Sequence, residues 1–176
     1  MRQGVKCNMA GKILGSVLIV AACFCMGYRL SIREKLRLDE LIFFKSAILK
    51  IMSELEHNRA TFCEALKASV DVEENDIFSS VYNAVKNNNA IKTAWKYAFE
   101  ENSDNCYMSR EDIDRLALTG EGFNSSDITL QKKYVANSVE YINSQEEIIK
   151  SKLERDKKVY RSVSVTIGLF IVLLLL

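Results

Sequence analysis

The chain has 176 residues, of which 48% are hydrophobic and 27% are charged, and its formal net charge is +1. This length and composition predict one small domain with additional apolar segments. A net charge this close to zero gives no global attraction for nucleic acid, so we expect no nucleic-acid partner. The chain contains no proline and only seven glycines, which is typical of a nearly all-helical protein.

The cysteine pattern argues against a metal site and against a disulfide framework. The number of cysteines is odd, and their spacing matches no metal-binding motif. Two of them lie inside an apolar segment. We therefore expect reduced thiols in a domain that faces the cytosol. The five cysteines are Cys7, Cys23, Cys25, Cys63 and Cys106.

The N-terminal region predicts a membrane helix. Residues 1–12 form a basic tail, within which Met9 is an alternative start to Met1. Residues 13–28 carry no charge and are predicted to form the first transmembrane helix. A spanning helix needs about 20 residues, so residues 9–11 would extend this shorter run. As an alternative, residues 20–23 resemble a lipoprotein cleavage box ending at Cys23, which would place the domain outside the cell. The apolar run continues beyond Cys23, which favours the membrane helix.

Residues 29–158 are predicted to form a cytoplasmic domain of six helices. Apolar residues from Leu41 to Leu55 step by three and four, so a first helix continues to about residue 57. Four short helices follow, and Trp95 lies on an apolar stripe expected to face the core. Their predicted starts and ends rest on the following residues: a capping box at Thr61–Glu64, a cap at Asn75 or Asp76, a start at Ser109–Asp112, and an end at Gly120 and Gly122.

A long final helix is predicted from about Asp127. Its apolar stripe recurs every seventh residue at Ile128, Val135, Ile142 and Ile149. We expect Ser125 or Ser126 to cap this helix.

The final helix leads into an apolar tail, residues 159–176, predicted as the second transmembrane helix. Counted from residue 159 the tail spans about 27 Å, against a membrane core of about 30 Å. A tail buried at the interface or in a partner remains an alternative. The predicted fold class is all-α, a helical bundle built on two long antiparallel helices with a transmembrane segment at each end.

Charge is distributed unevenly along the chain. Residues 54–127 contain 15 acidic and 7 basic side chains, whereas the two segments next to the apolar runs are basic. The positive-inside rule therefore places the central domain in the cytoplasm and both termini outside. The basic residues predicted to flank the membrane are Arg29, Arg33, Lys35, Arg37, Lys152, Arg155, Lys157, Lys158 and Arg161. We hypothesise that the acidic middle forms the far tip of the domain and docks a basic partner through Asp71, Glu73, Glu74 and Asp76.

No residue pattern indicates catalysis. His57 is the single histidine, so no second histidine is present to complete a metal site with it. Gly120 and Gly122 lack the spacing and the lysine of a phosphate-binding loop, and no calcium-loop pattern is present. We expect no enzyme activity, no cofactor, no metal and no small-molecule substrate.

Several short motifs, in their order and spacing, resemble a known family. They are Lys12-Ile-Leu-Gly15 opening an apolar run, Lys92-Thr-Ala-Trp95, Leu116 through Gly120-Glu121, Asp127 with Gln131-Lys132, and the long helix with its apolar tail. Together they resemble the stage III sporulation protein AB family of endospore-forming Firmicutes, over nearly the whole chain from Met9.

This resemblance implies a function that the residue pattern alone does not. Members belong to a channel complex between mother cell and forespore, and lie in the mother-cell membrane around the forespore. Their soluble domain is similar to the cytoplasmic domain of the type II secretion system F protein. The resemblance implies a platform that couples a secretion-type ATPase, stage III sporulation protein AA, to the other subunits. A membrane-anchored sensor or adaptor is the alternative, as is the lipoprotein described above.

Overall fold

The computed structural model describes the backbone of residues 3–175 and the side chains of residues 25, 29, 32–159, 162 and 163. Within residues 3–175 the chain forms seven helices and no strand, which confirms the all-α prediction. The helices are α1 (Gln3–His57), α2 (Phe62–Ser69), α3 (Asp76–Lys86), α4 (Ile91–Glu101), α5 (Arg110–Ala117), α6 (Thr119–Phe123) and α7 (Ile128–Leu175).

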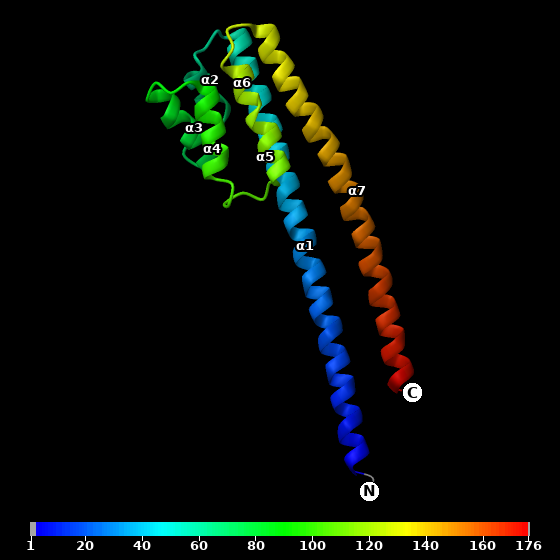
Figure 1. Ribbon diagram of the computed structural model, residues 1–176. Coiled ribbons are helices and arrows are strands. Elements are labelled where there is room, and N and C mark those ends of the chain that lie inside the picture. Colours follow the sequence, from blue (N-terminus) through cyan, green and yellow to red (C-terminus); the bar gives the residue numbers. More distant parts are fainter. Residues whose placement is uncertain (1–2, 176) are drawn as a thin grey trace.

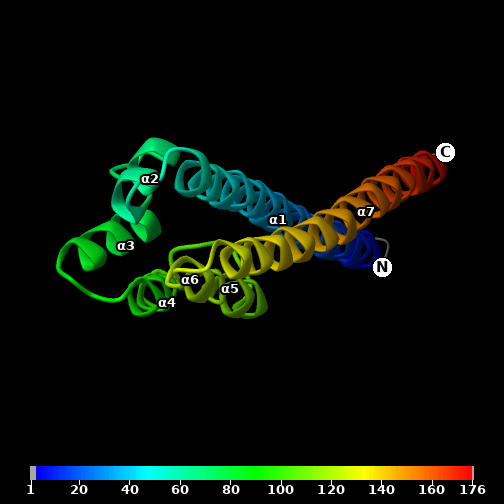
Figure 2. The ribbon, with the colours of Figure 1, turned by 90° about the horizontal axis from the view of Figure 1, so that it is seen from above.

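Two long helices dominate the molecule, because α1 has 55 residues and α7 has 48. They run side by side in opposite directions, and the short helices gather beside the end where α1 finishes and α7 begins (Figure 1). Seen from above, α2 lies beside α1, and α5 and α6 lie beside α7, whereas α3 and α4 pack against each other farther from the two long helices (Figure 2). We call residues 37–149 the head, and the parts of α1 and α7 outside this range the stem.

The core of the head is apolar and rich in aromatic rings. Trp95 is completely buried, as expected, and its indole Nε1 donates to the carbonyl oxygen of Leu116 over 3.0 Å. The rings of Phe44 and Phe78 pack with centroids 4.9 Å apart, so α1 and α3 share this core. The predicted stripe on α7 is confirmed at Val135, Ile142 and Ile149, which are all buried. The fourth member, Ile128, is 39% exposed, because it is the first residue of the helix and lies at the edge of the core.

Local capping explains where α2, α3 and α5 begin. The Thr61–Glu64 and Ser109–Asp112 capping boxes are both present, and the side chain of Asn75 accepts from the backbone N–H of Phe78. The expected serine cap of α7 is wrong. The Asp127 carboxylate accepts from the backbone N–H of Thr129 over 2.8 Å, and it therefore occupies the capping position.

The two glycines after α5 do not end a helix. They lie inside α6, an additional short helix that the sequence pattern did not predict, and neither glycine has a positive φ. Their role is close packing. A Cβ added at Gly120 would lie 2.5 Å from the Cβ of Trp95, and one added at Gly122 would lie 2.6 Å from the Cβ of Tyr134. The absent side chains therefore let α6 approach α4 and α7.

The predicted membrane segments fall largely outside the described side chains. This holds for residues 13–28, apart from residue 25, and for residues 159–176, apart from residues 159, 162 and 163. Within the described residues, no helix combines the length and the apolar character needed to cross a membrane.

Candidate functional site

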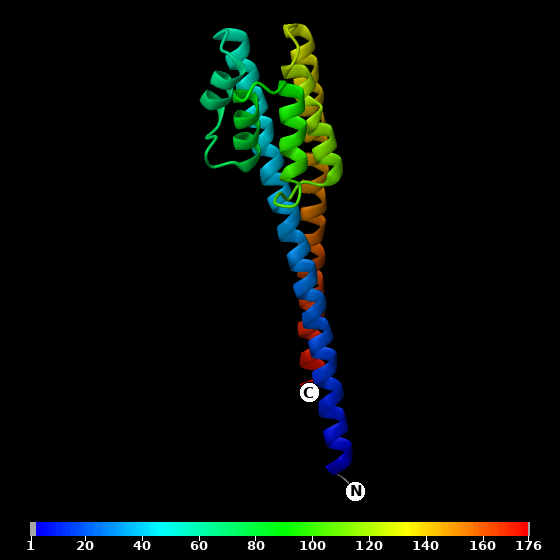
Figure 3. The same ribbon diagram turned by 60° about the vertical axis from the view of Figure 1, so that its left-hand side comes forward.

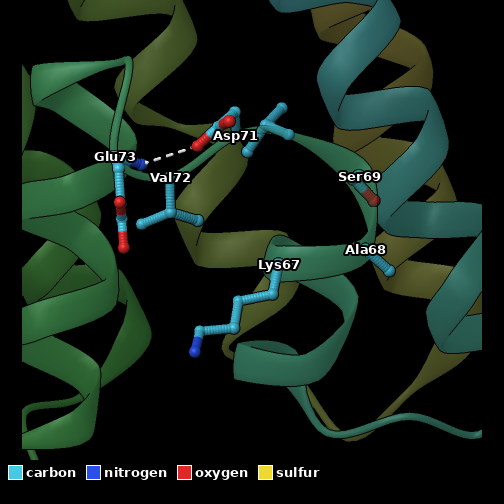
Figure 4. A pocket seen from close by; sticks show the side chains of 7 residues that line it. Lys67, Ala68, Ser69, Asp71, Val72 and Glu73 are labelled. Carbon is cyan, nitrogen blue, oxygen red and sulfur yellow. Dashed lines mark hydrogen bonds between the residues drawn. The ribbon is translucent and has the colours of Figure 1, made fainter.

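The predicted docking residues lie around the α2–α3 loop, residues 70–75. Asp71, Glu73, Glu74 and Asp76 all have exposed side chains. The Asp71 carboxylate is turned toward Glu73 and accepts from its backbone N–H over 3.1 Å, which shapes the loop (Figure 4). All four carboxylates are therefore available to solvent.

The position of this loop differs from the expected far tip of the domain. The loop lies at the stem-facing end of the head, on the side away from α7 (Figures 1 and 3). Helix α2 runs back from the end of α1, so the loop that follows α2 returns to the stem side. A shallow pocket there is lined by residues 67–73, with Lys67, Asp71 and Glu73 among them.

A buried ion pair joins α1 to α5 at the base of the head. Asp112, the third residue of α5, has a side chain with no exposed surface, and the Arg37 side chain is 19% exposed. The guanidinium binds the carboxylate in a bidentate manner, through two N–H donors. Arg37 Nε donates to Asp112 Oδ2 over 2.7 Å, and Arg37 Nη2 donates to Oδ1 over 2.8 Å. This planar geometry is specific to arginine, so lysine could not reproduce both bonds.

Helix α7 completes the same group of contacts. The Tyr141 hydroxyl donates to Asp112 Oδ1 over 2.7 Å, and Arg37 Nη2 also donates to the Gln145 side-chain oxygen over 3.0 Å. The capping box adds a bond from the Ser109 backbone N–H to Asp112 Oδ2, at 2.7 Å. Three helices therefore converge on one carboxylate, which has a partner on every side.

These contacts perturb the protonation of the groups involved. Burial alone would raise the pKa of Asp112, but the hydrogen bonds from Arg37, Ser109 and Tyr141 outweigh it, and the pKa lies below its usual range. Burial and the Asp112 carboxylate raise the pKa of Tyr141. Burial also raises the pKa of nearby Glu40, although the backbone N–H of Tyr107 donates to its carboxylate over 2.7 Å. Asp112 is consequently ionised at neutral pH and paired with a permanent cation.

The pair continues into the stem. Arg37 Nη1 lies 3.7 Å from a carboxylate oxygen of Glu34, and Lys152 Nζ lies 2.5 Å from the other oxygen of Glu34. The charges of these residues and Asp112 alternate in sign along the series. We call Glu34, Arg37, Asp112, Tyr141, Gln145 and Lys152 the clamp.

The basic residues predicted to flank the membrane therefore divide into two groups. Arg37 and Lys152 belong to the clamp. The side chain of Arg161 lies outside the described residues. The remaining six have exposed side chains: Arg29, Arg33, Lys35, Arg155, Lys157 and Lys158.

Sequence reasoning found Asp112 only as part of a helix start and missed its ion pair. The capping box is visible in the sequence, but the partner of Asp112 lies 75 residues away. The described residues contain no cluster of metal-binding side chains. The Nδ1 atom of the exposed His57 ring lies 3.2 Å from the carbonyl oxygen of Ser53.

Known proteins that are similar to this chain share one name, stage III sporulation protein AB. A curated Bacillus subtilis (strain 168) protein, stage III sporulation protein AB, is 20% identical over 169 residues, covering 94% of this chain and 99% of that protein. A solved structure of stage III sporulation protein AB (SpoIIIAB) has a TM-score of 0.61 at 15% identity, covering 68% of this chain and 97% of that one. This second likeness shows a shared fold. The family model of stage III sporulation protein AB matches residues 12–176. This match spans nearly the whole chain, and the protein belongs to the stage III sporulation protein AB family.

Proposed function

We propose that this protein is a non-enzymatic membrane platform within a sporulation-specific, secretion-like channel complex between mother cell and forespore. Family membership supports a role in sporulation. The finer role rests on the family resemblance described above. In this proposal the platform couples a cytoplasmic ATPase, stage III sporulation protein AA, to the other channel subunits. It lies in the mother-cell membrane around the forespore, crosses it twice, and keeps its head in the cytoplasm.

One observation carries the proposal. The outer ends of α1 and α7, at Gln3 and Leu175, point away from the head toward the same end of the molecule (Figure 1). The uncharged sequences of residues 13–28 and 163–176 belong to those ends. Exposed basic residues, including Arg29, Arg33 and Lys157, lie between these sequences and the head. A helical hairpin with two apolar ends, and with exposed basic residues between those ends and the head, suits a two-pass anchor at an anionic membrane surface.

The partner-binding part of the proposal rests on charge. Asp71, Glu73, Glu74 and Asp76 are exposed at the stem-facing end of the head, and they suit a basic surface on an ATPase or on another subunit. Exposed charges of this kind mainly set the association rate and the orientation of the partners.

The topology is tested by cysteine accessibility in a version without native cysteines. One reporter cysteine replaces Asp71, and another follows Leu176. We expect the first reporter to be shielded in intact cells and labelled in inverted vesicles, with the second reversed. Labelling of the Asp71→Cys reporter in intact cells would place the head outside and refute a cytoplasmic platform.

Co-purification tests the platform role separately from topology. A platform should purify with the ATPase and channel subunits in a fixed ratio. A sensor or adaptor should instead bind an effector in amounts that change with the signal. Absence of any channel subunit from the purified material would contradict the platform role, even if the predicted topology held.

A further inference from the structure

The apolar contact between α1 and α7 fades where the two helices leave the head. Toward the stem, the last buried apolar side chains within the described residues are Leu38 on α1 and Ile149 on α7. Beyond them Leu153 is partly buried, whereas Ile32 is 41% exposed and Val159 is 53% exposed. Within the described residues, apolar packing therefore holds the helices together in the head but supplies little in the stem.

Polar contacts between the two helices continue past that point. Lys132 pairs with Glu56 at 2.6 Å, and Lys45 with Glu146 at 3.0 Å, both within the head. The pair nearest the chain ends, within the described residues, is Lys152 with Glu34. The Lys152 side chain is 45% exposed, so water screens this pair and it cannot by itself hold the helices at a fixed separation.

The clamp connects this weak pair to a rigid one. Glu34 also contacts Arg37, which is fixed by both oxygens of Asp112. Asp112 is in turn held by the start of α5 and by Tyr141 on α7. The contacts therefore form a closed path from α7 through α1 and α5 back to α7. A closed path restricts both the separation and the rotation of the helices, which a single exposed ion pair does not.

We propose that Asp112 is a positioning residue, and that the clamp fixes the separation of α1 and α7 where they leave the head. Helix α5 contacts both long helices through Asp112, which binds Arg37 on α1 and Tyr141 on α7. Without the clamp, the head would remain packed while the stem helices would spread or rotate. All the contacts of the clamp lie within one chain, so its effect on the stem can be measured in the absence of channel partners.

Distances between paired spin labels test this separation in the purified full chain in detergent. The stem pair replaces exposed Arg33 and Glu154 with labelled cysteines in a version whose native cysteines are alanine. The reference pair replaces exposed Lys50 and Ala136, which lie beside the buried contacts of the head. Each pair is measured by pulsed electron paramagnetic resonance in the parent, in Asp112→Asn and in the control Asp114→Asn. Asp114 lies on the same helix and is exposed.

We expect Asp112→Asn to give a longer and broader distance distribution for the stem pair and an unchanged one for the reference pair. Asp114→Asn should change neither. An unchanged stem distribution in Asp112→Asn would overturn the proposal. Equal broadening of both pairs would also overturn it, because Asp112 would then stabilise the whole domain rather than position the stem.

A milder variant keeps the test usable if Asp112→Asn does not fold. Tyr141→Phe retains the ring and removes only the hydroxyl that donates to Asp112. We expect a smaller broadening of the stem pair with an unchanged reference pair. A Tyr141→Phe stem distribution identical to the parent would contradict the closed path through α7.

Discussion

Two acidic sites of the head differ in what surrounds them. Asp112 lies in the first turn of α5 and has no exposed side-chain surface, whereas Asp71, in the α2–α3 loop, is exposed. The carboxylate of Asp71 binds a backbone N–H two residues away. The carboxylate of Asp112 binds side chains from α1 and α7 as well as its own helix start. Similar local motifs can therefore produce one carboxylate that joins three helices and another that remains exposed.

Removing the buried carboxylate should produce the largest effect. Asp112→Ala removes the carboxylate that binds Arg37 through two hydrogen bonds, and it leaves Tyr141 without its acceptor. Breaking a buried ion pair costs roughly 3–5 kcal/mol of the free energy of unfolding. Urea unfolding of the full chain in detergent, followed by fluorescence of the single tryptophan, Trp95, measures this loss. The matched change Asp71→Ala should alter the same free energy by less than about 0.5 kcal/mol. An equal loss of unfolding free energy in Asp112→Ala and Asp71→Ala would show that the two carboxylates do not differ in their contribution to stability.

Removing one donor to Asp112 should have a smaller effect. Tyr141→Phe deletes the hydroxyl that donates to the carboxylate over 2.7 Å, while the ring remains. Hydrogen bonds to charged groups contribute roughly 1.5–3 kcal/mol, and we expect a loss of that order in the free energy of unfolding. Tyr97→Phe is the control, because Tyr97 is 58% exposed. A Tyr141→Phe variant as stable as the Tyr97→Phe control would show that α7 gains nothing from this contact.

Acid should weaken the buried site selectively. The hydrogen bonds that outweigh burial hold the pKa of Asp112 below its usual value. A lowered carboxyl pKa contributes stability above the unfolded-state pKa, about 3.9, and this stability is lost as the pH falls through the folded-state pKa. The difference in unfolding free energy between the parent and Asp112→Asn should therefore be largest near neutral pH and shrink below about pH 4. Other carboxylates with lowered pKa values, such as Glu146, are common to both chains and cancel. A difference that stays constant down to low pH would show that ionisation of Asp112 does not stabilise the fold.

Local signals in the sequence predicted much of the fold. The capping boxes at Thr61 and Ser109 need only residues within one helical turn, and both are present. The seven-residue spacing on α7 predicted the burial of Val135, Ile142 and Ile149 because it depends only on helical geometry. Sequence patterns are informative here because the relevant neighbours are close along the chain.

The features that sequence reasoning missed depend on distant neighbours. Nothing near Arg37 distinguishes it from Arg33, yet Arg37 joins Asp112 while Arg33 is exposed. The glycines of α6 were expected to end a helix. Their actual role, close packing against Trp95 and Tyr134, cannot be inferred from local spacing. The direction of the α2–α3 loop likewise depends on how α2 packs back along α1. Local propensity cannot supply this information, which arises only when the helices pack.

Reversing the exposed acids should affect binding and leave the fold nearly unchanged. Asp71, Glu73 and Glu74 are exposed and have no partners on other helices within the described residues. The triple change to lysine should shift the unfolding free energy by no more than about 0.5 kcal/mol per substitution. Its effect should appear in the association rate with purified stage III sporulation protein AA, compared at low and high salt. Screening over about 10 Å at 0.1 M salt should weaken binding of the parent and remove most of the difference between parent and variant. The control reverses the exposed α7 residues Glu140, Glu147 and Glu154, which changes the net charge equally at another place. Equal slowing by both triple variants would assign the effect to net charge, whereas no slowing by either would remove the α2–α3 loop as the docking site.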